Sequence, residues 1–318
     1  MLLGGLLDLG LGEPANRWHP VCWMGKAVDL ADWAAPGRER SGRSQRVSGL
    51  ATAFLLPSGT YLLARRFLKS LPWPLSMAAG AGLASTAIAT RSLFEQARKV
   101  EEGLFADLEV GRREVGRMVG RDVDGLDEVG VIRAAVESVA ENANDGVIAP
   151  IFYGLIGGAP LALAYKTINT LDSMIGYRDE QYLYFGWMSA RIDDVAGFIP
   201  ARLTAFSAAI LSPLVKGSPM GALSVWRRDA SLHDSPNAGV CESAYAGALG
   251  VQLGGPGSYA GKPVAKAFIG EGLRPPAATD ITRAARLMGA SSALVLVLGA
   301  TVRAGVVLTR FFLRRRRG

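Results

Sequence analysis

Residues 133–146 read Arg133-Ala-Ala-Val-Glu-Ser-Val-Ala-Glu-Asn-Ala-Asn-Asp145-Gly146, and an apolar segment of membrane-spanning length follows them directly. At 3.6 residues per turn, five polar side chains share one third of the circumference of a helix. These side chains are Arg133, Glu137, Glu141, Asn144 and Asp145. A stripe of carboxylates and amides beside a membrane segment is unfavourable unless it binds a cation or takes part in chemistry. The stretch therefore predicts a helix that carries a functional site at a membrane.

The composition of the chain predicts an all-α, polytopic helical membrane protein. Of its 318 residues, 49% are hydrophobic and 39 are glycine, and the mean hydropathy is +0.21. Small residues are frequent where helices pack closely in a bilayer. About five segments have the roughly 17–25 residues that a spanning helix needs. They are residues 47–64, 71–90, 146–165, 195–215 and 287–308. The alternative is a very apolar soluble helical bundle.

The basic residues behind the formal net charge of +7 are concentrated beside the expected membrane segments. One cluster comprises Arg38, Arg40, Arg43 and Arg46, and another comprises residues 314–317. Such clusters usually mark the cytoplasmic side of a membrane and contact anionic lipid. No basic motif with interleaved aromatic residues and no known nucleic-acid-binding module is found. We therefore expect a lipid bilayer and no nucleic acid as a partner, and a multi-pass location in the cytoplasmic (inner) membrane.

Three polar stretches separate the apolar segments: residues 91–145, 166–194 and 216–286. We predict a single membrane-embedded domain over residues 1–318 in which these stretches form the site. If every apolar segment crosses the membrane, the first two stretches lie on opposite sides. Either residues 146–165 are re-entrant or broken, as their prolines and glycines would allow, or the site lies within the bilayer. Irregular backbone at that depth is tolerated where it lines a cavity enclosed by protein. The sequence leaves both alternatives open.

Three further clusters carry groups that are suited to chemistry. Lys166, Asn169 and Asp172 place a cation, an amide and a carboxylate within two helical turns. Lysine binds phosphate as a point charge, and the oxygens of Asn and Asp suit Mg²⁺. The pair Asp193 and Asp194 is repulsive unless a cation lies between the carboxylates or one of them is protonated.

Arg191 and Arg202 flank that acidic pair. The third cluster is residues 233–239, where Ser-Pro-Asn-Ala-Gly follows His233 and Asp234 and predicts a rigid turn. Each cluster also has a structural interpretation, such as an ion pair between residues four apart on a helix, a helix cap, or an arginine that extends its charge toward water.

The same residues carry a resemblance that extends over nearly the whole chain. The motifs are Arg91-Ser-Leu-Phe-Glu95, Val119-Gly-Arg121-Asp122, Arg133 to Asn142, Asp145-Gly-Val-Ile-Ala-Pro150, Tyr165 to Tyr177, Tyr184-Phe-Gly-Trp187, Ala190-Arg-Ile-Asp-Asp194, Ile199 to Leu203 and Ser235-Pro-Asn-Ala-Gly239. They closely resemble the adenosylcobinamide-phosphate synthase family of cobalamin biosynthesis, the CobD/CbiB family. Glu13 and Gln96 depart from the family pattern, which has Asp at the first position and His at the second. We assign neither position a role in the site.

The resemblance implies an integral membrane enzyme, an ATP-dependent acid–amine ligase. It would attach (R)-1-aminopropan-2-ol or its O-phosphate to the propionate carboxylate of adenosylcobyric acid and give adenosylcobinamide or its phosphate. ATP and Mg²⁺ would be required, and the corrinoid would be a substrate. The site would face the cytoplasm, and other enzymes of the cobalamin pathway are candidate partners.

The clustering of the polar residues, together with this resemblance, predicts which of them are catalytic, bind metal or bind substrate. The predicted catalytic residues are Glu137, Glu141, Asp172 and Lys166. The predicted metal ligands are Glu141, Asp145, Asp172, Asp193 and Asp194. The predicted substrate-binding or phosphate-binding residues are Arg91, Arg133, Asn142, Asn169, Arg191, Arg202, His233 and Asn237. One alternative is a Mg²⁺-dependent intramembrane transferase of the polyprenyl type, although the regular Asp-x-x-x-Asp spacing of such enzymes is absent. The other is a corrinoid or ion transporter.

Overall fold

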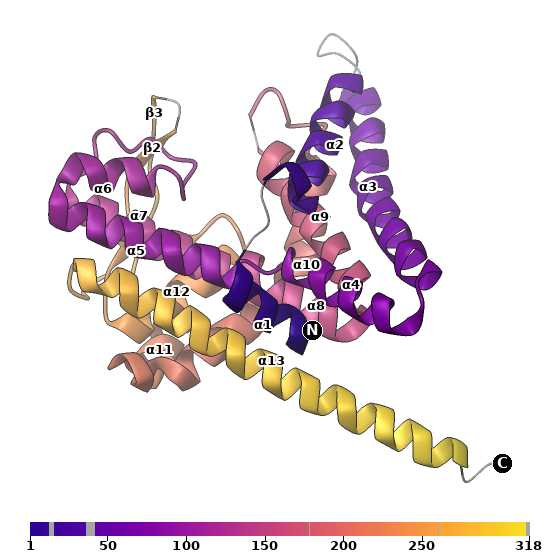
Figure 1. The fold of residues 1–318 in the computed structure, drawn as a ribbon. Helices are drawn as coiled ribbons and strands as arrows, with labels where there is room; N and C mark the ends of the chain where they lie inside the picture. Colours follow the sequence, from indigo (N-terminus) through magenta and orange to yellow (C-terminus); the bar gives the residue numbers. More distant parts are fainter. Residues whose placement is uncertain (13–15, 36–41, 178, 260, 316–318) are drawn as a thin grey trace. The chain divides into compact units, whose positions relative to one another are not determined.

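The computed structural model describes residues 1–12, 16–35, 42–177, 179–259 and 261–315, and most of them are helical (Figure 1). The all-α class expected from the sequence is confirmed. Of the residues discussed above, some lie outside the described ones: Glu13, Arg38, Arg40, Arg316 and Arg317.

The described chain forms two compact units. Unit 1 comprises Met1–Ala89, Ala149–Ala196 and Ala293–Gly318, and unit 2 comprises Thr90–Ile148 and Gly197–Ser292. Two helices contribute residues to both units, α10 (Trp187–Leu211) and α13 (Ala278–Arg315). The single domain over residues 1–318 stays a prediction.

In unit 1 the helices gather around α9. The helices that lie wholly in this unit are α1 (Leu2–Leu11), α2 (Pro20–Ala34), α3 (Gly42–Ser70), α4 (Trp73–Ser85), α8 (Ala149–Gly157) and α9 (Ala159–Ile175), with a short 3₁₀ turn at Asn16–Trp18. Helices α2, α3, α4 and α8 all contact α9, and Figure 1 shows α2 and α3 beside it. Its apolar side chains pack into a core with those of α2; Leu171 and Ile175 contact Val28 there.

The expected membrane segment at residues 146–165 is not one continuous helix. Helix α8 ends at Gly157, and Gly158 has a φ of 73°, a left-handed backbone conformation that favours glycine. Pro160 then lies in the first turn of α9, where its missing N–H is tolerated. The segment is therefore broken at Gly158, as its prolines and glycines would allow.

Unit 2 contains the helices formed by the first polar stretch and those formed by the third. They are α5 (Thr90–Ala106), α6 (Leu108–Val115), α7 (Glu128–Asn142), a π-helical turn η2 (Ala143–Ile148), α11 (Pro219–Asp229) and α12 (Ala238–Leu249), with 3₁₀ turns η3 (Ser212–Val215) and η4 (Ala230–Leu232). Helices α5, α6 and α7 contact one another, and α12 contacts both α7 and α11. Helix α12 is buried along its whole length.

The stretch that opens the sequence analysis forms α7, but its last residues differ from the prediction. Asp127 caps the helix because its carboxylate accepts a hydrogen bond from the Gly130 N–H at 2.7 Å. Asn144 and Asp145 lie in the π-helical turn, whose wider spiral rotates them away from the positions predicted with 3.6 residues per turn. The apolar face is buried, as are Glu137 and Asn144 of the stripe, whereas Glu141 is exposed.

Among the described residues, three helices are long and apolar enough to cross a membrane. They span Gly42–Ser70, Trp187–Val215 and Ala278–Val306. These helices include the expected segments 47–64 and 195–215 and most of 287–308. Residues 71–90 instead contain the 13-residue helix α4, which is shorter than a membrane-spanning helix.

Two small antiparallel sheets lie in the third polar stretch, where no strand was expected. Strand β1 (Leu253–Gly254) pairs with β4 (Phe268–Ile269), and β2 (Gly257–Tyr259) pairs with β3 (Lys262–Val264). Strands of two or three residues are too short to produce a recognisable alternation of apolar and polar residues. Strand β1 also contacts α7 and α12, which brings this loop region onto the helices of the unit.

Helices α11 and α12 approach each other through glycines. A Cβ added at Gly247 on α12 would lie 2.2 Å from the carbonyl oxygen of Gly221 on α11. Because that oxygen belongs to the backbone, the contact can be relieved only by moving a helix.

We predict that Gly247→Ala lowers the stability of the protein by about 1–3 kcal/mol, as expected for forcing extra atoms into a packed interior. Gly289→Ala is the control, because no atom lies within 4 Å of its added Cβ and the position is inside helix α13. The control should be neutral or more stable by roughly 0.5–1 kcal/mol. Thermal unfolding in detergent measures both variants, and equal melting temperatures would contradict the close helix contact.

Candidate functional site

The two units divide the residues that the sequence assigns to the site. Unit 2 holds Arg91, Arg133, Glu137, Glu141, Asn142, Asp145, Arg202, His233 and Asn237. Unit 1 holds Lys166, Asn169, Asp172, Arg191, Asp193 and Asp194.

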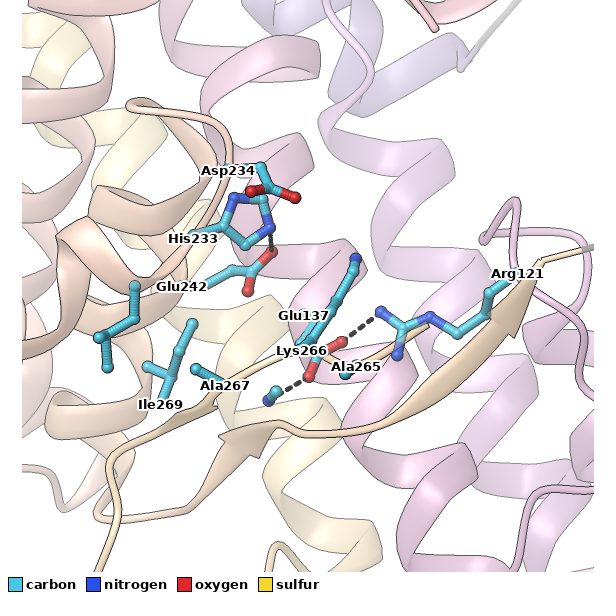
Figure 2. A pocket seen from close by; sticks show the side chains of 11 residues that line it. Arg121, Glu137, His233, Asp234, Glu242, Ala265, Lys266, Ala267 and Ile269 are labelled. Atoms are coloured by element: carbon cyan, nitrogen blue, oxygen red, sulfur yellow. Dashed lines mark hydrogen bonds and ion pairs between the residues drawn. The ribbon is translucent and has the colours of Figure 1, made fainter. Parts of the chain in front are cut away.

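In unit 2, three of these residues meet at the wall of a polar cavity: Glu137, Glu141 and His233. The cavity consists of two adjoining hollows of about 170 Å³ and about 80 Å³. Figure 2 shows the smaller hollow, with Glu137 from α7, Glu242 from α12 and side chains from the connecting segments around it. Five side chains line both hollows: Arg121, Glu137, His233, Glu242 and Lys266. Sequence reasoning missed Arg121, Glu242 and Lys266 as members of the site.

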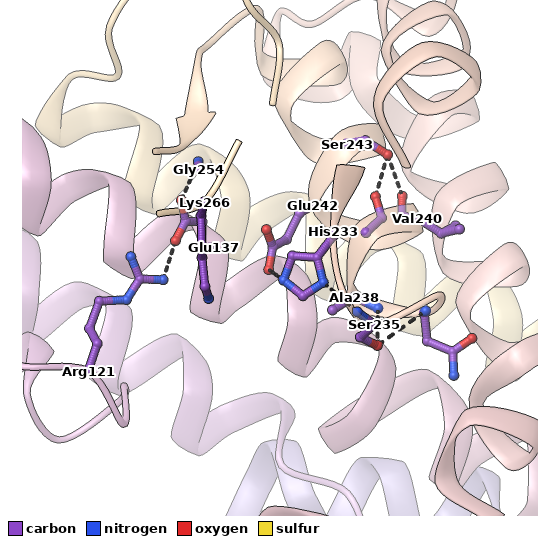
Figure 3. Close-up of polar contacts among 12 residues, drawn as sticks. Arg121, Glu137, His233, Ser235, Ala238, Val240, Glu242, Ser243, Gly254 and Lys266 are labelled. Carbon is purple, nitrogen blue, oxygen red and sulfur yellow. Dashed lines mark hydrogen bonds and ion pairs between the residues drawn. The ribbon is translucent and has the colours of Figure 1, made fainter. Parts of the chain in front are cut away.

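The Glu137 carboxylate is buried and has a partner on each oxygen. Its Oε2 accepts a hydrogen bond from the Arg121 guanidinium, and the two groups form an ion pair. Its Oε1 accepts a hydrogen bond from the Gly254 N–H on β1 at 2.5 Å (Figure 3). Burial works against the charge of Arg121, but the Glu137 carboxylate outweighs it and raises the pKa of the guanidinium. The guanidinium of Arg121 is therefore held charged against the Glu137 side chain.

The ring of His233 is held in one tautomer. Its Nδ1 accepts a hydrogen bond from the backbone N–H of Ser235 at 2.9 Å. In the neutral ring the hydrogen must therefore be on Nε2, which faces the Glu242 Oε1 at 3.7 Å (Figures 2 and 3). Burial, and then the Lys266 charge, lowers the pKa of His233, which favours this neutral form.

The predicted turn at residues 233–239 positions that ring at the start of α12. The Ser235 hydroxyl oxygen accepts hydrogen bonds from the N–H groups of Asn237 at 3.3 Å and Ala238 at 3.2 Å. These bonds satisfy two N–H groups at the beginning of the helix. Glu242 follows one turn later on the same helix, so the turn and the helix together set the distance between imidazole and carboxyl.

Glu242 is a buried carboxyl in a helix of small and apolar residues. Only 7% of its side chain is exposed. Desolvation by burial raises the pKa of Glu242 well above its ordinary value, and the charges of Glu137 and Glu141 raise it further. A single carboxylate within Ala238–Leu249 is the sequence signal that could have identified this residue.

Glu141 lies one turn after Glu137 and lines the larger hollow. Its side chain is accessible to water there, but the surrounding protein limits the hydration of its charge. This desolvation, and then the Asp145 carboxylate, raises the pKa of Glu141 to about 7. Lys266 contributes a cation to the same hollow, and its Nζ donates a hydrogen bond to the Tyr259 hydroxyl at 2.9 Å.

Other predicted residues of unit 2 make contacts outside this lining. The Arg133 guanidinium lies 5.4 Å from the centre of the Phe268 ring. Asn142 donates to the Ser138 carbonyl oxygen at 2.9 Å. Arg202 donates to the Asn237 Oδ1 at 3.1 Å, which brings two predicted residues together.

Two acidic residues of unit 2 have close partners on their own elements. Asp145 accepts a hydrogen bond from the Asn144 side chain at 2.6 Å. Glu95 forms an ion pair with Arg91 at 2.7 Å. The Arg91 pair matches the structural interpretation of residues four apart on a helix.

In unit 1 the predicted residues lie on α9 and α10. Lys166 donates to the Asn169 Oδ1 at 2.8 Å, and Asp172 lies one turn further along α9. On α10, Arg191 and Asp194 form a 3.8 Å ion pair, and Asp193 is buried. Among the described residues, no group of three or more His, Cys, Asp or Glu side chains is arranged to hold a metal ion. The metal ligand set stays a prediction.

The fold and the cavity define the class of the molecule. It is an all-α membrane protein, and its second unit contains a polar cavity lined by groups of both charges. The chain belongs to the CobD/CbiB family, because the family model described as CobD/Cbib protein matches residues 1–288.

Relatives are similar over nearly their whole length. A protein of Geobacter metallireducens named cobalamin biosynthesis protein CobD is 45% identical over 315 residues, which are 97% of this chain and 98% of the relative. A Mycobacterium tuberculosis protein of the same name is 42% identical over 305 residues, 94% of each chain. Cobalamin biosynthesis protein CbiB of Salmonella arizonae is 40% identical over 301 residues, 92% of this chain and 93% of the relative. No solved structure matches the chain.

We predict that Glu137→Ala lowers stability by about 3 kcal/mol, because it leaves the buried Arg121 charge and the Gly254 N–H without their acceptor. The matched control is Glu102→Ala, whose ion pair with Arg98 is exposed on both sides and should change stability by less than about 1 kcal/mol. Thermal unfolding in detergent provides the comparison. A Glu137 variant as stable as the control would show that the pair is not required.

We predict that the Glu141 carboxyl titrates near pH 7 in metal-free protein. In the infrared spectrum, the band of the protonated Glu141 carboxyl is identified by its absence in Glu141→Gln. In the wild type this band should be lost as the pH rises, with a midpoint near pH 7. Because the folded-state pKa is raised above the unfolded value, the protonated form favours folding at acid pH, and this contribution is lost as the pH rises through about 7. A midpoint near 4.5, the ordinary pKa of a glutamate carboxyl, would contradict the prediction. Glu102→Gln, at an exposed position, should leave the band unchanged near neutral pH.

Proposed function

We propose that this protein acts in cobalamin biosynthesis as an ATP-dependent ligase. It would form an amide between the propionate carboxylate of adenosylcobyric acid and the amine of (R)-1-aminopropan-2-ol or its O-phosphate. Membership of the CobD/CbiB family and the names of the relatives support a role in cobalamin biosynthesis. The observation that supports ligase chemistry is the polar cavity of unit 2, where two cations and three carboxyl groups line one small space.

The chemistry of amide formation requires groups of both charges. A carboxylate is a poor acylating agent, so we propose that its oxygen first attacks the γ-phosphorus of ATP and ADP leaves. The amine then attacks the carbon of the acyl phosphate, and the C–O bond to phosphate breaks. The first step concentrates negative charge that cations must offset. The second step needs a proton acceptor for the amine.

The size of the cavity limits what it can enclose. Ligand pockets usually occupy about 300–1,000 Å³, whereas these hollows measure about 170 Å³ and about 80 Å³. A phosphate group or a small amino alcohol fits such a space, and a whole corrinoid or nucleotide does not. We therefore propose that the cavity takes the reacting groups, with Arg121 and Lys266 stabilising phosphate charge.

The carboxylates of this region fit a Mg²⁺ ion that is shared with a nucleotide. Mg²⁺ is usually held by one or two carboxylates together with substrate phosphates and water, and does not need a cage of protein ligands. Glu141 and Asp145 are close enough for the charge of one to raise the pKa of the other, so we propose them as the residues that would hold the ion. When bound, Mg²⁺ would neutralise phosphate charge. Glu141 must be deprotonated to serve as a ligand.

The predicted residues of unit 1 complete the proposal. We propose that Lys166, Asn169 and Asp172 contact phosphate or propionate groups, since they present a cation, an amide and a carboxylate on neighbouring turns of α9. We also propose that the protein lies in the cytoplasmic membrane with its site toward the cytoplasm. ATP and the corrinoid substrate are supplied on that side.

One assay tests the proposed function. The detergent-solubilised protein is incubated with adenosylcobyric acid, aminopropanol phosphate, ATP and Mg²⁺, and the amide is detected by mass. We expect an amide whose formation requires ATP. Prenyl transfer or corrinoid transport without amide formation would overturn the proposal.

We predict that alanine at Glu141 or at Asp172 abolishes amide formation while the protein remains folded in membranes. Each change removes a carboxylate that is proposed to act on phosphate or metal. Glu271→Ala, at an exposed position of unit 2, is the control and should retain wild-type activity. Near-normal turnover of either test variant would remove that residue from the proposed site.

A further inference from the structure

Glu242 is the carboxyl of the cavity that the proposed function leaves without a role. It projects from α12 into both hollows. All twelve residues of this helix are buried, and Glu242 is its one ionisable carboxyl. A buried carboxyl within apolar surroundings is unfavourable unless it has a partner or a task.

Among the described residues, the two cations that act on Glu242, Lys266 and Arg121, are each held by another group. The His233 Nε2 lies 3.7 Å from the Glu242 Oε1, and the tautomer fixed by the Ser235 N–H leaves that ring neutral with its hydrogen toward Glu242. The Arg121 guanidinium is paired with Glu137. The Lys266 ammonium is held by the Tyr259 hydroxyl.

This environment makes the Glu242 carboxylate a strong proton acceptor. The ionised form projects from a helix that is buried along its whole length, so gaining a proton relieves the desolvation of its charge. An ammonium group that enters the cavity would be desolvated in the same way. Transfer of one proton from ammonium to carboxylate converts two buried charges into two neutral groups, which burial favours.

We propose that Glu242 is the base that accepts the proton of the substrate amine, and that His233 orients it. This inference rests on the proposed function and names the group that generates the nucleophile. An N–H bond of the ammonium breaks and an O–H bond forms on Glu242, which leaves the free amine. The amine nitrogen then bonds to the acyl carbon, the C–O bond to phosphate breaks, and the second amine proton leaves with the phosphate. His233 is a positioning residue, because its Nε2–H faces the carboxyl oxygen.

The test separates this proton transfer from the earlier activation of the carboxylate. Hydroxylamine is largely unprotonated at neutral pH and captures an acyl phosphate as a hydroxamate without a base. The full-length protein in detergent is given adenosylcobyric acid, ATP and Mg²⁺, with either aminopropanol phosphate or hydroxylamine. Amide and hydroxamate are measured by mass for the wild type and for Glu242→Gln, which keeps the shape of the side chain.

We expect Glu242→Gln to lower the rate of amide formation by about 10²–10⁴-fold, the range for general base catalysis, while hydroxamate formation stays close to the wild-type rate. His233→Ala should show the same separation with a smaller effect. Glu271→Gln, an exposed carboxylate of the same unit, should leave both rates unchanged.

Two results would overturn the inference: amide formation that persists in Glu242→Gln, or an equal loss of amide and hydroxamate in a folded variant. If Glu242→Gln does not fold, Glu242→Asp replaces it. That variant keeps the carboxyl but withdraws it by one methylene, and an unchanged amide rate would likewise contradict the proposal. If the wild-type protein gives neither amide nor hydroxamate, the proposed function itself is refuted. If the wild type gives both products and Glu242→Gln loses both, only the role of Glu242 is refuted.

Discussion

The structure of unit 2 depends on the complete pairing of one buried charge, the carboxylate of Glu137. One oxygen binds the Arg121 guanidinium, and the other accepts the Gly254 N–H. Through these bonds α7 is joined to the segment that precedes it and to strand β1. A buried carboxylate with one partner missing would be strongly unfavourable, so all three segments must be in place for any of them to be stable.

This pairing also determines the electrostatic character of the cavity. Because the Arg121 guanidinium is paired with Glu137, it cannot form an ion pair with a second carboxyl group in the same geometry. Among the described residues, no arginine forms an ion pair with Glu242 or Glu141, and desolvation raises the pKa of both carboxyl groups. A structural ion pair thus leaves two neighbouring acids with raised pKa values, which is the arrangement expected where protons are transferred near neutral pH.

The sequence predicted the parts of the fold that local pattern determines. The polar stripe of α7 and the turn before α12 each depend on residues that are adjacent in the chain, whereas the break around Gly158 was only one of two alternatives. The π-helical turn did not follow from the 3.6-residue period, because that period assumes a continuous α-helix. Strands β1 to β4 are too short to carry a periodic signal.

The composition of the cavity could be predicted only in part. Glu137 and Glu141 share one helix face, so their proximity follows from spacing. Arg121, Glu242 and Lys266 reach the cavity from distant segments, and no local pattern places them together. Glu242 had a signal that could have been used, a single carboxylate in an apolar helix, whereas Lys266 lies in an irregular connection that offers none.

The hydrogen bond between the Ser235 N–H and the His233 Nδ1 has a consequence for the path of protons through the molecule. A histidine can relay a proton only if one ring nitrogen accepts it while the other releases one. Here Nδ1 is already occupied by a backbone N–H that cannot move away without unwinding the turn before α12. The imidazole therefore cannot relay protons. Any proton gained inside the cavity has to leave with a departing molecule or through the open hollow.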